Sequence, residues 1–341
     1  MDTVTAHVAD LWSAEGERIH CRLCPNDCRI AEGATGVCGV RRNVAGQLIA
    51  ETYARVSSAA VDPIEKKPVF HYRPGTLAFS IGSVGCSMRC GHCQNWQISR
   101  AHPEDGELKL LPPADVPVLA GRNGCEGVAF TYNEPVIWAE YVRDTAVAAK
   151  AAGLYTVMVT NGYVTAEGLD YLGDVIDVWR VDVKGFSDAT YRTLCHVPHV
   201  APVLEQAERA KKTWGMHVEV VTNVVPTIND DEETIRGIAR WIRESLGPDT
   251  PWHITRFFPY LEMSHLPATP LATLRWARAV GVEEGLSFVY LGNVDEPGGE
   301  DTACPLCGKV LIERDGFSVD RDGVTDGGRC PDCGRDLGIV K

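Results

Sequence analysis

The sequence lacks any long uninterrupted apolar stretch. Across its 341 residues no apolar run approaches 18 in length, and its start carries no basic segment followed by an apolar one. A membrane-spanning helix needs about 20 consecutive apolar residues, and a secretory signal needs both of those parts. We therefore expect a soluble, cytoplasmic protein with no membrane partner.

Basic residues are also in short supply. Lys and Arg number 33 against 46 for Asp and Glu, which gives a net charge of −13. Proteins that bind nucleic acid usually present a basic face to the phosphate backbone, and this sequence has no stripe that mixes basic with aromatic residues. Nucleic acid is therefore an unfavoured partner.

Cysteine, by contrast, is plentiful. The chain has 13 cysteines, and eleven of them fall into three spaced groups. A reducing cytosol disfavours disulfides, so metal binding explains the groups better.

The central group consists of Cys86, Cys90 and Cys93, with the spacing C-x3-C-x2-C. A [4Fe–4S] cluster normally takes four cysteine thiolates. A loop that supplies three leaves the fourth iron free to bind a molecule that reacts. The alternative is a zinc ion completed by His92, but zinc sites usually combine two C-x2-C-like pairs, and the other cysteine groups fit that pattern better.

The N-terminal group consists of Cys21, Cys24, Cys28 and Cys38, spaced C-x2-C-x3-C-x9-C. Four ligands close a coordination sphere, which fits either structural zinc or an auxiliary [4Fe–4S] cluster. The cluster would be an electron relay, whereas zinc would fold a region too small for its own core. The spacing alone does not decide, and we favour the structural role.

The C-terminal group consists of two C-P-x-C-G motifs, which contain Cys304, Cys307, Cys330 and Cys333. Such paired motifs predict tetrahedral coordination by four sulfurs, with zinc or a single rubredoxin-like iron. We favour zinc because zinc ribbons are commoner.

Two cysteines stand outside the groups. Cys125 precedes a predicted strand, so we expect a small buried residue there. Cys195 follows a predicted strand and could lie at the end where that strand stops, where a thiol could donate a hydrogen atom to a reactive intermediate. We favour an inert thiol, since free cysteine is among the most buried residue types.

Between the cysteine groups, strands alternate with helices. Apolar runs predict strands at 76–84, 127–132, 155–160, 177–183, 217–222 and 252–257, with a further candidate at 288–291. Helical periodicity predicts a helix at about 136–152 and another after the fifth strand, capped by Asp230 or Asp231. This order implies right-handed βαβ units and a parallel sheet.

We predict an α/β protein, an incomplete barrel of six β/α units with small cysteine-rich metal-binding appendages at both ends. Residues 1–75 would form the N-terminal metal-binding region and barrel cover, 76–294 the barrel, and 295–341 a zinc-ribbon or rubredoxin-like module. Residues 36–75, including the loop 61–68, and residues 258–268 are candidates for covering the mouth, because a reactive intermediate must be shielded from water.

Polar motifs follow the ends of the predicted strands, where parallel barrels place their reactive groups. Any one of these residues could merely cap a helix, but their joint position on one rim favours a binding site. They are Asn133, Glu134 and Pro135, Thr160 to Gly162, Asp182, Lys184, Asn223, His253 and Arg256.

Several of these motifs resemble a known superfamily. The C-x3-C-x2-C loop, Thr131 to Pro135, Thr160 to Gly162 and Asp182 to Lys184 resemble motifs of radical S-adenosylmethionine (SAM) enzymes related to the pyruvate formate-lyase activating enzymes. More narrowly, the N-terminal cysteine pattern, residues 253–259, residues 292–294 and the C-terminal cysteine motifs resemble the radical SAM member of the AmmeMemoRadiSam system. That similarity covers nearly the whole chain.

The resemblance implies that Cys86, Cys90 and Cys93 carry a [4Fe–4S] cluster whose open iron chelates SAM. One-electron reduction would then cleave SAM to a 5′-deoxyadenosyl radical. A low-potential ferredoxin or flavodoxin would supply the electron, and Memo-like and AMMECR1-like proteins would be partners. The resemblance also suggests cofactor-binding residues: Asn133 and Glu134 beside the methionyl group, Asp182 and Lys184 near its carboxylate or the ribose, and in addition Asn161 and His253.

One position departs from the activating enzymes. They tend to read Asp-Thr-Asn-Gly at the third strand end, where the acid helps to hold a monovalent cation, whereas this chain has Val159. The sequence therefore predicts a radical SAM enzyme that abstracts hydrogen from a substrate it does not identify. The alternatives are an activase that forms a glycyl radical on a partner protein and a metal-stabilised nucleic-acid-binding protein.

Overall fold

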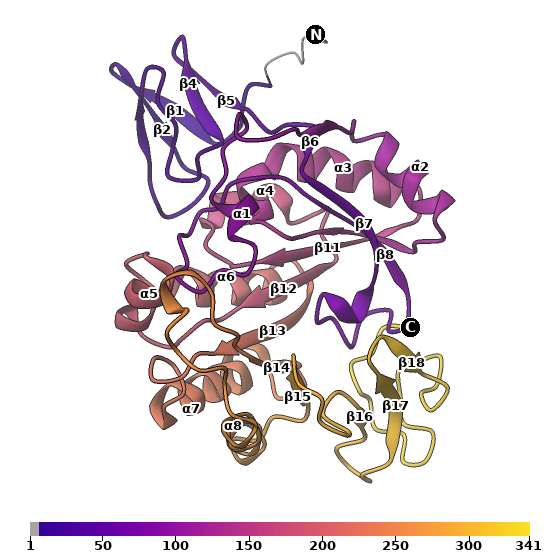
Figure 1. The fold of residues 1–341 in the computed structure, drawn as a ribbon. Coiled ribbons are helices and arrows are strands. Elements are labelled where there is room, and N and C mark those ends of the chain that lie inside the picture. Colours follow the sequence, from indigo (N-terminus) through magenta and orange to yellow (C-terminus); the bar gives the residue numbers. More distant parts are fainter. Residues whose placement is uncertain (1–6) are drawn as a thin grey trace.

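The centre of the structure is an eight-stranded sheet. The computed structural model describes residues 7–341, and the sheet order is β15-β14-β13-β12-β11-β10-β8-β7. The strands are β7 (Ser58–Pro63), β8 (Leu77–Gly82), β10 (Gly127–Phe130), β11 (Tyr155–Thr160), β12 (Val178–Asp182), β13 (His217–Val224), β14 (Trp252–Arg256) and β15 (Val289–Gly292). From β8 onward all of them run parallel and stand in chain order, so the chain advances along the sheet in one direction (Figure 1).

A helix follows each of the six parallel strands from β8 to β14, which confirms the six predicted units. These helices are α2 (Asp115–Arg122), α3 (Ala139–Ala151), α4 (Ala166–Leu172), α6 (Ala201–Lys212), α7 (Glu232–Trp241) and α8 (Leu271–Glu283). For example, α3 packs on β10 and β11, and α8 packs on β14 and β15. The sheet does not close on itself, because β7 and β15 are its edges, so the barrel is incomplete.

The strand sequences are nearly continuous apolar runs because the helices and the barrel interior bury both faces. All four residues of β10 are buried, and so are five of the six in β11. The edge strand β7 was not identified from the sequence. It pairs antiparallel with β8 and lies in the segment expected to cover the barrel.

Short elements complete the connections. The α-helices α1 (Trp96–Ser99) and α5 (Asp188–Cys195) lie after β8 and β12, and the 3-10 helices are η1 (Ile64–Lys66), η2 (Pro135–Trp138) and η4 (Leu261–Met263). Helix α7 begins at Asp231, whose carboxylate accepts a hydrogen bond from Thr234 N at 2.9 Å. Of the two predicted caps, the structure therefore selects Asp231. The chain continues past α7 as a π-helical turn, η3 (Ile242–Leu246).

The N-terminal region is built from short antiparallel strands. They are β1 (Trp12–Glu15), β2 (Arg18–Cys21) and β3 (Arg29–Ala31) in one sheet, β4 (Arg41–Val44) and β5 (Gln47–Ala50) in a second, and β6 (Arg55–Val56) with β9 (Lys109–Leu110) in a third. A buried ion pair fixes the region to α3, because Arg41 Nη2 lies 2.7 Å from a carboxylate oxygen of Glu140.

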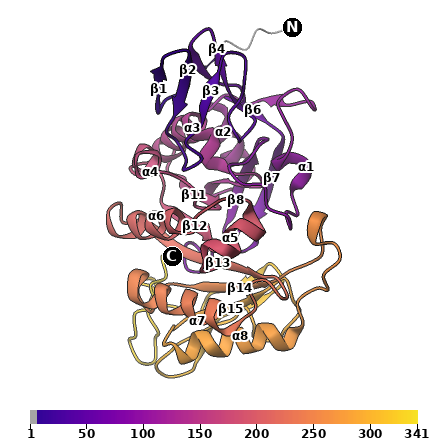
Figure 2. The same cartoon turned by 90° about the vertical axis from the view of Figure 1, so that its left-hand side faces the viewer.

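The C-terminal region packs against the other side of the barrel. Its strands are β16 (Thr302–Ala303), β17 (Val310–Asp315) and β18 (Ser318–Asp320). Phe288 and Tyr290 share a core with Leu311 and Ile312 of this region. Figures 1 and 2 show the indigo N-terminal strands and the yellow C-terminal strands at separate ends of the molecule. None of the helices within residues 7–341 has the length and apolar character to cross a bilayer.

Candidate active site

The loop that follows β8, residues 85–96, is here called the cysteine loop. Asn133, which follows β10, holds its start. The side-chain oxygen of Asn133 accepts a hydrogen bond from Ser83 N (2.9 Å), and its amide nitrogen donates to the carbonyls of Val84 (3.2 Å) and Gly85 (3.1 Å). Asn133, at the end of β10, therefore positions the cysteine loop, which follows the neighbouring strand β8.

The three thiols of the cysteine loop line one cavity of about 480 Å³ at the carboxyl ends of the strands. Within residues 7–341, Cys86, Cys90, Cys93 and His92 do not form a set whose ligand atoms lie within 4.8 Å of one another. Four thiolates around a zinc ion stand about 3.8 Å apart, so these side chains are not arranged around a single zinc ion. The cavity lining includes no further cysteine. A [4Fe–4S] cluster bound there would therefore have one iron without a cysteine ligand from the lining.

Five of the six predicted cofactor-binding residues line the same cavity: Asn133, Glu134, Asn161, Asp182 and Lys184. They come from the ends of β10, β11 and β12. A volume of this size is typical of sites for small molecules and cofactors. A cavity of about 540 Å³ lies at the opposite ends of the strands, but its lining contains none of the predicted site residues.

Glu134 ties two strand ends together. One carboxylate oxygen accepts hydrogen bonds from Val136 N (2.9 Å) and Thr160 Oγ1 (2.6 Å), and the other accepts from Asn161 N (2.7 Å). Burial raises the pKa of Glu134 to about 7, although these donors oppose the shift. Asn161 in turn donates a hydrogen bond to Ser87 Oγ at 3.1 Å, so the hydrogen-bond network around Glu134 extends to the cysteine loop.

Asp182 lies between two cations. One of its oxygens contacts Arg180, and the other accepts a hydrogen bond from Lys184 Nζ at 2.7 Å. Burial alone would raise the pKa of Asp182, but Arg180 and Lys184 outweigh it and lower the pKa to about 2. Burial alone would lower the pKa of Lys184, but the neighbouring Asp182 outweighs burial and raises it. The site therefore holds three charged groups at neutral pH.

The structure places His253 elsewhere, which corrects the expectation that it binds the cofactor. Its Nε2 lies 2.6 Å from a carboxylate oxygen of Glu219, which is fully buried. Thr255 lines the cavity and His253 does not. Both residues face the barrel interior, but each strand residue advances about 3.3 Å, so His253 lies roughly two residue steps deeper. Its role here is to satisfy a buried carboxylate.

Sequence reasoning did not identify Arg180 as a site residue. It is a lone cation inside an otherwise apolar strand, and this contrast is the signal that could have revealed it. Sequence reasoning also did not link Asp62 to the mouth. Asp62 is buried and accepts hydrogen bonds from Lys66 (2.7 Å), Lys67 (2.6 Å) and Tyr132 (2.6 Å). Both lysines line the cavity, so this cluster forms part of the cavity wall.

The two isolated cysteines lie at opposite ends of the barrel. Cys125 is buried and lines a cavity with Tyr155 and Asp177, away from the cysteine loop. Cys195 is fully buried, and its carbonyl accepts a hydrogen bond from Arg89 N at 3.1 Å. The Cys195 thiol lies against Cys90 of the cysteine loop, and Cys195 is not among the residues that line the cavity.

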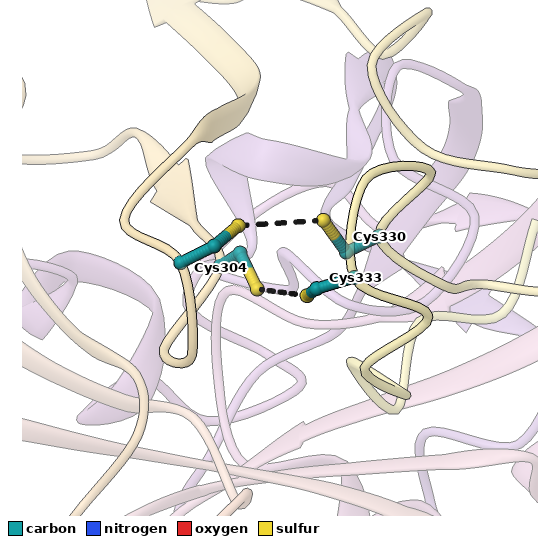
Figure 3. A group of neighbouring side chains, drawn as sticks. Cys304, Cys330 and Cys333 are labelled. Atoms are coloured by element: carbon teal, nitrogen blue, oxygen red, sulfur yellow. Dashed lines mark hydrogen bonds between the residues drawn. The ribbon is translucent and has the colours of Figure 1, made fainter.

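The four C-terminal cysteines come together as predicted. Figure 3 shows the facing sulfurs, with Cys304 and Cys333 3.5 Å apart and Cys307 and Cys330 3.7 Å apart. All four sulfurs lie within 4.8 Å of one another. This spacing matches tetrahedral coordination, so the four sulfurs of the appendage fit a single metal ion.

The four N-terminal cysteines lie beside the cysteine loop. Cys21, Cys24 and Cys38 are buried and Cys28 is half-buried. Within residues 7–341, their sulfurs do not lie within 4.8 Å of one another, as those of the C-terminal group do.

With this geometry established, the chain can be placed in a family. Residues 80–242 match the sequence model of the Radical SAM superfamily. An uncharacterized protein of Methanocaldococcus jannaschii, MJ0808, is 41% identical over 329 residues, which cover 96% of this chain and 97% of that relative. The chain belongs to the radical SAM superfamily. Membership indicates an enzyme and implies an iron–sulfur cluster and SAM as its cofactors.

More distant similarities refine this class. The pyruvate formate-lyase 1-activating enzyme of Escherichia coli (strain K12) is 27% identical over 166 residues, which cover 47% of this chain and 66% of that enzyme. The crystal structure of a radical SAM methyltransferase from Sphaerobacter thermophilus aligns with a TM-score of 0.51 at 13% identity, covering 64% of this chain and 66% of the other. The latter similarity shows the fold, a radical SAM α/β partial barrel.

Proposed function

We propose that this protein binds SAM at a [4Fe–4S] cluster held by Cys86, Cys90 and Cys93 and uses it to abstract a hydrogen atom from an organic substrate. When bound and reduced by one electron, the cluster supplies cleavage of SAM to methionine and a 5′-deoxyadenosyl radical, which becomes 5′-deoxyadenosine on taking hydrogen. The observation that carries the proposal is that three thiols from one loop face a cavity lined by polar strand ends.

The residues around the cavity have complementary roles. Lys184 uses one ammonium hydrogen on Asp182, which leaves further donors for a carboxylate such as that of SAM. Asp182 keeps a lysine–arginine pair in place and offers acceptors toward hydroxyl groups. Asn133 and Glu134 set the position of the cysteine loop and of the β11 end. Their backbone and side chains then border the space for the methionyl group.

An activase that forms a glycyl radical on a partner protein is the second candidate, favoured by the similarity to the pyruvate formate-lyase activating enzymes over 47% of the chain. The apolar Val159 lines the cavity and offers no ligand for a monovalent cation there. Deuterium from a labelled glycine of a partner protein appearing in 5′-deoxyadenosine would establish the activase.

We also infer the protein partners and the metal of the C-terminal site. A ferredoxin or flavodoxin would deliver the electron, and resemblance to the AmmeMemoRadiSam system suggests Memo-like and AMMECR1-like proteins as partners. For the C-terminal four-cysteine site, whose sulfur spacing fits a single tetrahedral zinc or iron ion, we infer zinc because zinc ribbons are commoner.

The direct test is SAM cleavage. We expect the anaerobically reconstituted chain, given dithionite and SAM, to release 5′-deoxyadenosine, measured by liquid chromatography. Cys90→Ala should reduce this at least about 100-fold, because the cluster loses a ligand. Cys125→Ser is the matched control, since that thiol lies at the other end of the barrel. Absence of product from wild-type protein with an intact cluster would contradict the proposal and favour a binding module.

A further inference from the structure

The N-terminal cysteines gather at one place. The backbone N–H of Cys21 donates to the carbonyl of Cys28 at 2.9 Å, which pairs the first and third positions of the motif. Val37 N donates to Cys28 Sγ at 3.4 Å, which brings the neighbouring Cys38 to the same side. Cys24 lies in the turn between Cys21 and Cys28 and is also buried. All four thiols are free, so the group is ready to bind metal.

The spread of these sulfurs distinguishes the two metal centres that the motif allows. The C-terminal group provides an internal standard, because the same structure closes its four sulfurs to within 4.8 Å. Among residues 7–341 no three of the N-terminal sulfurs come that close to one another. A single tetrahedral zinc ion requires about 3.8 Å between thiolates. A cube with one thiolate on each iron corner holds them farther apart.

Hydrogen bonds to sulfur also suit an iron–sulfur cluster. In addition to the bond from Val37 N, the side-chain amide of Asn26 lies 3.5 Å from Cys24 Sγ. Donors of this kind stabilise the negative charge that a thiolate-ligated cube carries and adjust its potential.

The N-terminal group is in direct contact with the cysteine loop. The same Asn26 amide nitrogen donates to the carbonyl of Ser87 at 2.7 Å, so one side chain joins Cys24 Sγ to the residue after Cys86. A second contact comes from Arg89, which donates to the carbonyl of Val37 at 2.9 Å.

Backbone packing brings the two groups together at a third point. A Cβ atom on Gly85 would lie 2.6 Å from the carbonyl oxygen of Cys38, so only glycine permits this approach. The residue before the first ligand of one group therefore touches the last ligand of the other.

We propose that Cys21, Cys24, Cys28 and Cys38 hold a second [4Fe–4S] cluster, ligated by all four thiolates, that relays electrons to the SAM-binding cluster. A low-potential one-electron donor reduces the second cluster from the 2+ to the 1+ state. The cluster returns to 2+ as the SAM-binding cluster is reduced from 2+ to 1+, with no bond made or broken. The relay rests on the proposed function, whereas the identity of the second cluster does not.

The identity is tested without disturbing the N-terminal region. In the triple variant Cys86→Ala, Cys90→Ala, Cys93→Ala, prepared anaerobically, we expect about four iron atoms per chain, against about eight in the wild type. Dithionite should produce an electron paramagnetic resonance signal that SAM does not change. A triple variant with no iron and about two zinc ions per chain by elemental analysis, one beyond the zinc inferred at the C-terminal site, would overturn the proposal.

The relay is tested by comparing two reductants. Cys28→Ala should lose at least tenfold in SAM cleavage driven by reduced flavodoxin but less than about twofold with dithionite, a small reductant that can reach the open cavity. Cys125→Ser should match the wild type with both. Equal losses with both reductants, with the four irons of the SAM-binding site still present, would overturn the relay. Failure of the wild type with both reductants would overturn the proposed function and the relay, while iron retained in the triple variant would still establish the second cluster.

Discussion

Asp182 shows how a single residue sets the charge of the site. Its two oxygens engage Arg180 and Lys184, whose side chains are 9% and 12% exposed. Its folded pKa of about 2 lies below the ordinary value, so the ionised form stabilises the fold. That contribution is present in full at neutral pH and is lost only as the pH falls toward 2.

We predict that Asp182→Asn lowers the free energy of unfolding by about 2–4 kcal/mol at pH 7, because it leaves two largely buried cations without a carboxylate. Denaturant titration measures the change. The double variant Asp182→Asn, Lys184→Met should recover part of the loss, since it removes one of those cations. A loss below about 0.5 kcal/mol in the single variant would contradict this account.

For single residues, the sequence indicated which side chains face the barrel interior better than it indicated how deep in the barrel each one lies. Period-two alternation showed that His253 and Thr255 share a face, but it carries no information on which layer of the barrel each one occupies. The predicted strand included one residue beyond the observed end at Arg256, and His253 and Arg256 were both assigned to the rim. His253 instead meets Glu219, a buried carboxylate whose partner could not be inferred from spacing along either strand.

Helix α7 is the element whose local signals agree best. Asp231 caps its first turn, and Ile235, Ile238 and Ala239 are buried against the barrel. A stripe at helical spacing, a cap and a following Gly247 were all visible in the sequence, so both the helix and its start could be predicted.

We expect Asp231→Ala to reduce stability by about 1 kcal/mol, because Thr234 N loses its acceptor. Glu233→Ala is the matched control. It removes an exposed carboxylate from the same turn without breaking a cap, so its effect should stay within about 0.5 kcal/mol. Urea unfolding of the two variants gives the comparison, and equal losses would show that the charge matters and the cap does not.

Strand β7 marks the limit of prediction for elements. Its sequence, SAAVDP, contains a proline and few strong strand formers, so local preference does not reveal it. It forms because the edge of β8 is available for pairing, and proline is tolerated on an edge strand. This tertiary cause also brings Asp62 to the cavity wall.

Over the whole molecule, the C-terminal metal site is linked to the barrel by Arg314. Its guanidinium lies 4.1 Å from the ring centre of Phe70 and donates to the Phe70 carbonyl at 3.0 Å. Tyr290 of β15 lies in the same core. The appendage therefore covers one end of the barrel.

We predict that Cys307→Ser with Cys333→Ser removes one metal ion per chain and destabilises the protein by about 3 kcal/mol or more, while the iron content stays unchanged. Elemental analysis and thermal unfolding measure these effects. Faster amide exchange at Val340, which bonds to His71 O at 2.8 Å, would locate the loosened contact. Loss of iron in this variant would contradict the separation of the C-terminal metal site from the iron–sulfur sites.

The three cysteine groups could be recognised from spacing, and so could the alternation of strands and helices. Spacing could not reveal which groups lie together. The N-terminal motif ends 48 residues before Cys86 in the chain, and only the fold brings Asn26 to Ser87. Distances between sulfurs likewise come from three-dimensional structure, and they show the C-terminal group alone, among the described residues, as a compact set of four.

The pairing of Tyr72 with Val340 has a consequence for the order in which the molecule is made. Arg73 N donates to the carbonyl of Val340 at 2.7 Å. The backbone near residue 72 therefore cannot form this hydrogen bond until a residue more than 260 positions later has been synthesised. While the ribosome is still at work, that stretch has no such neighbour. Contacts this remote in the chain slow folding, and the base of the barrel is complete only once Val340 has left the exit tunnel.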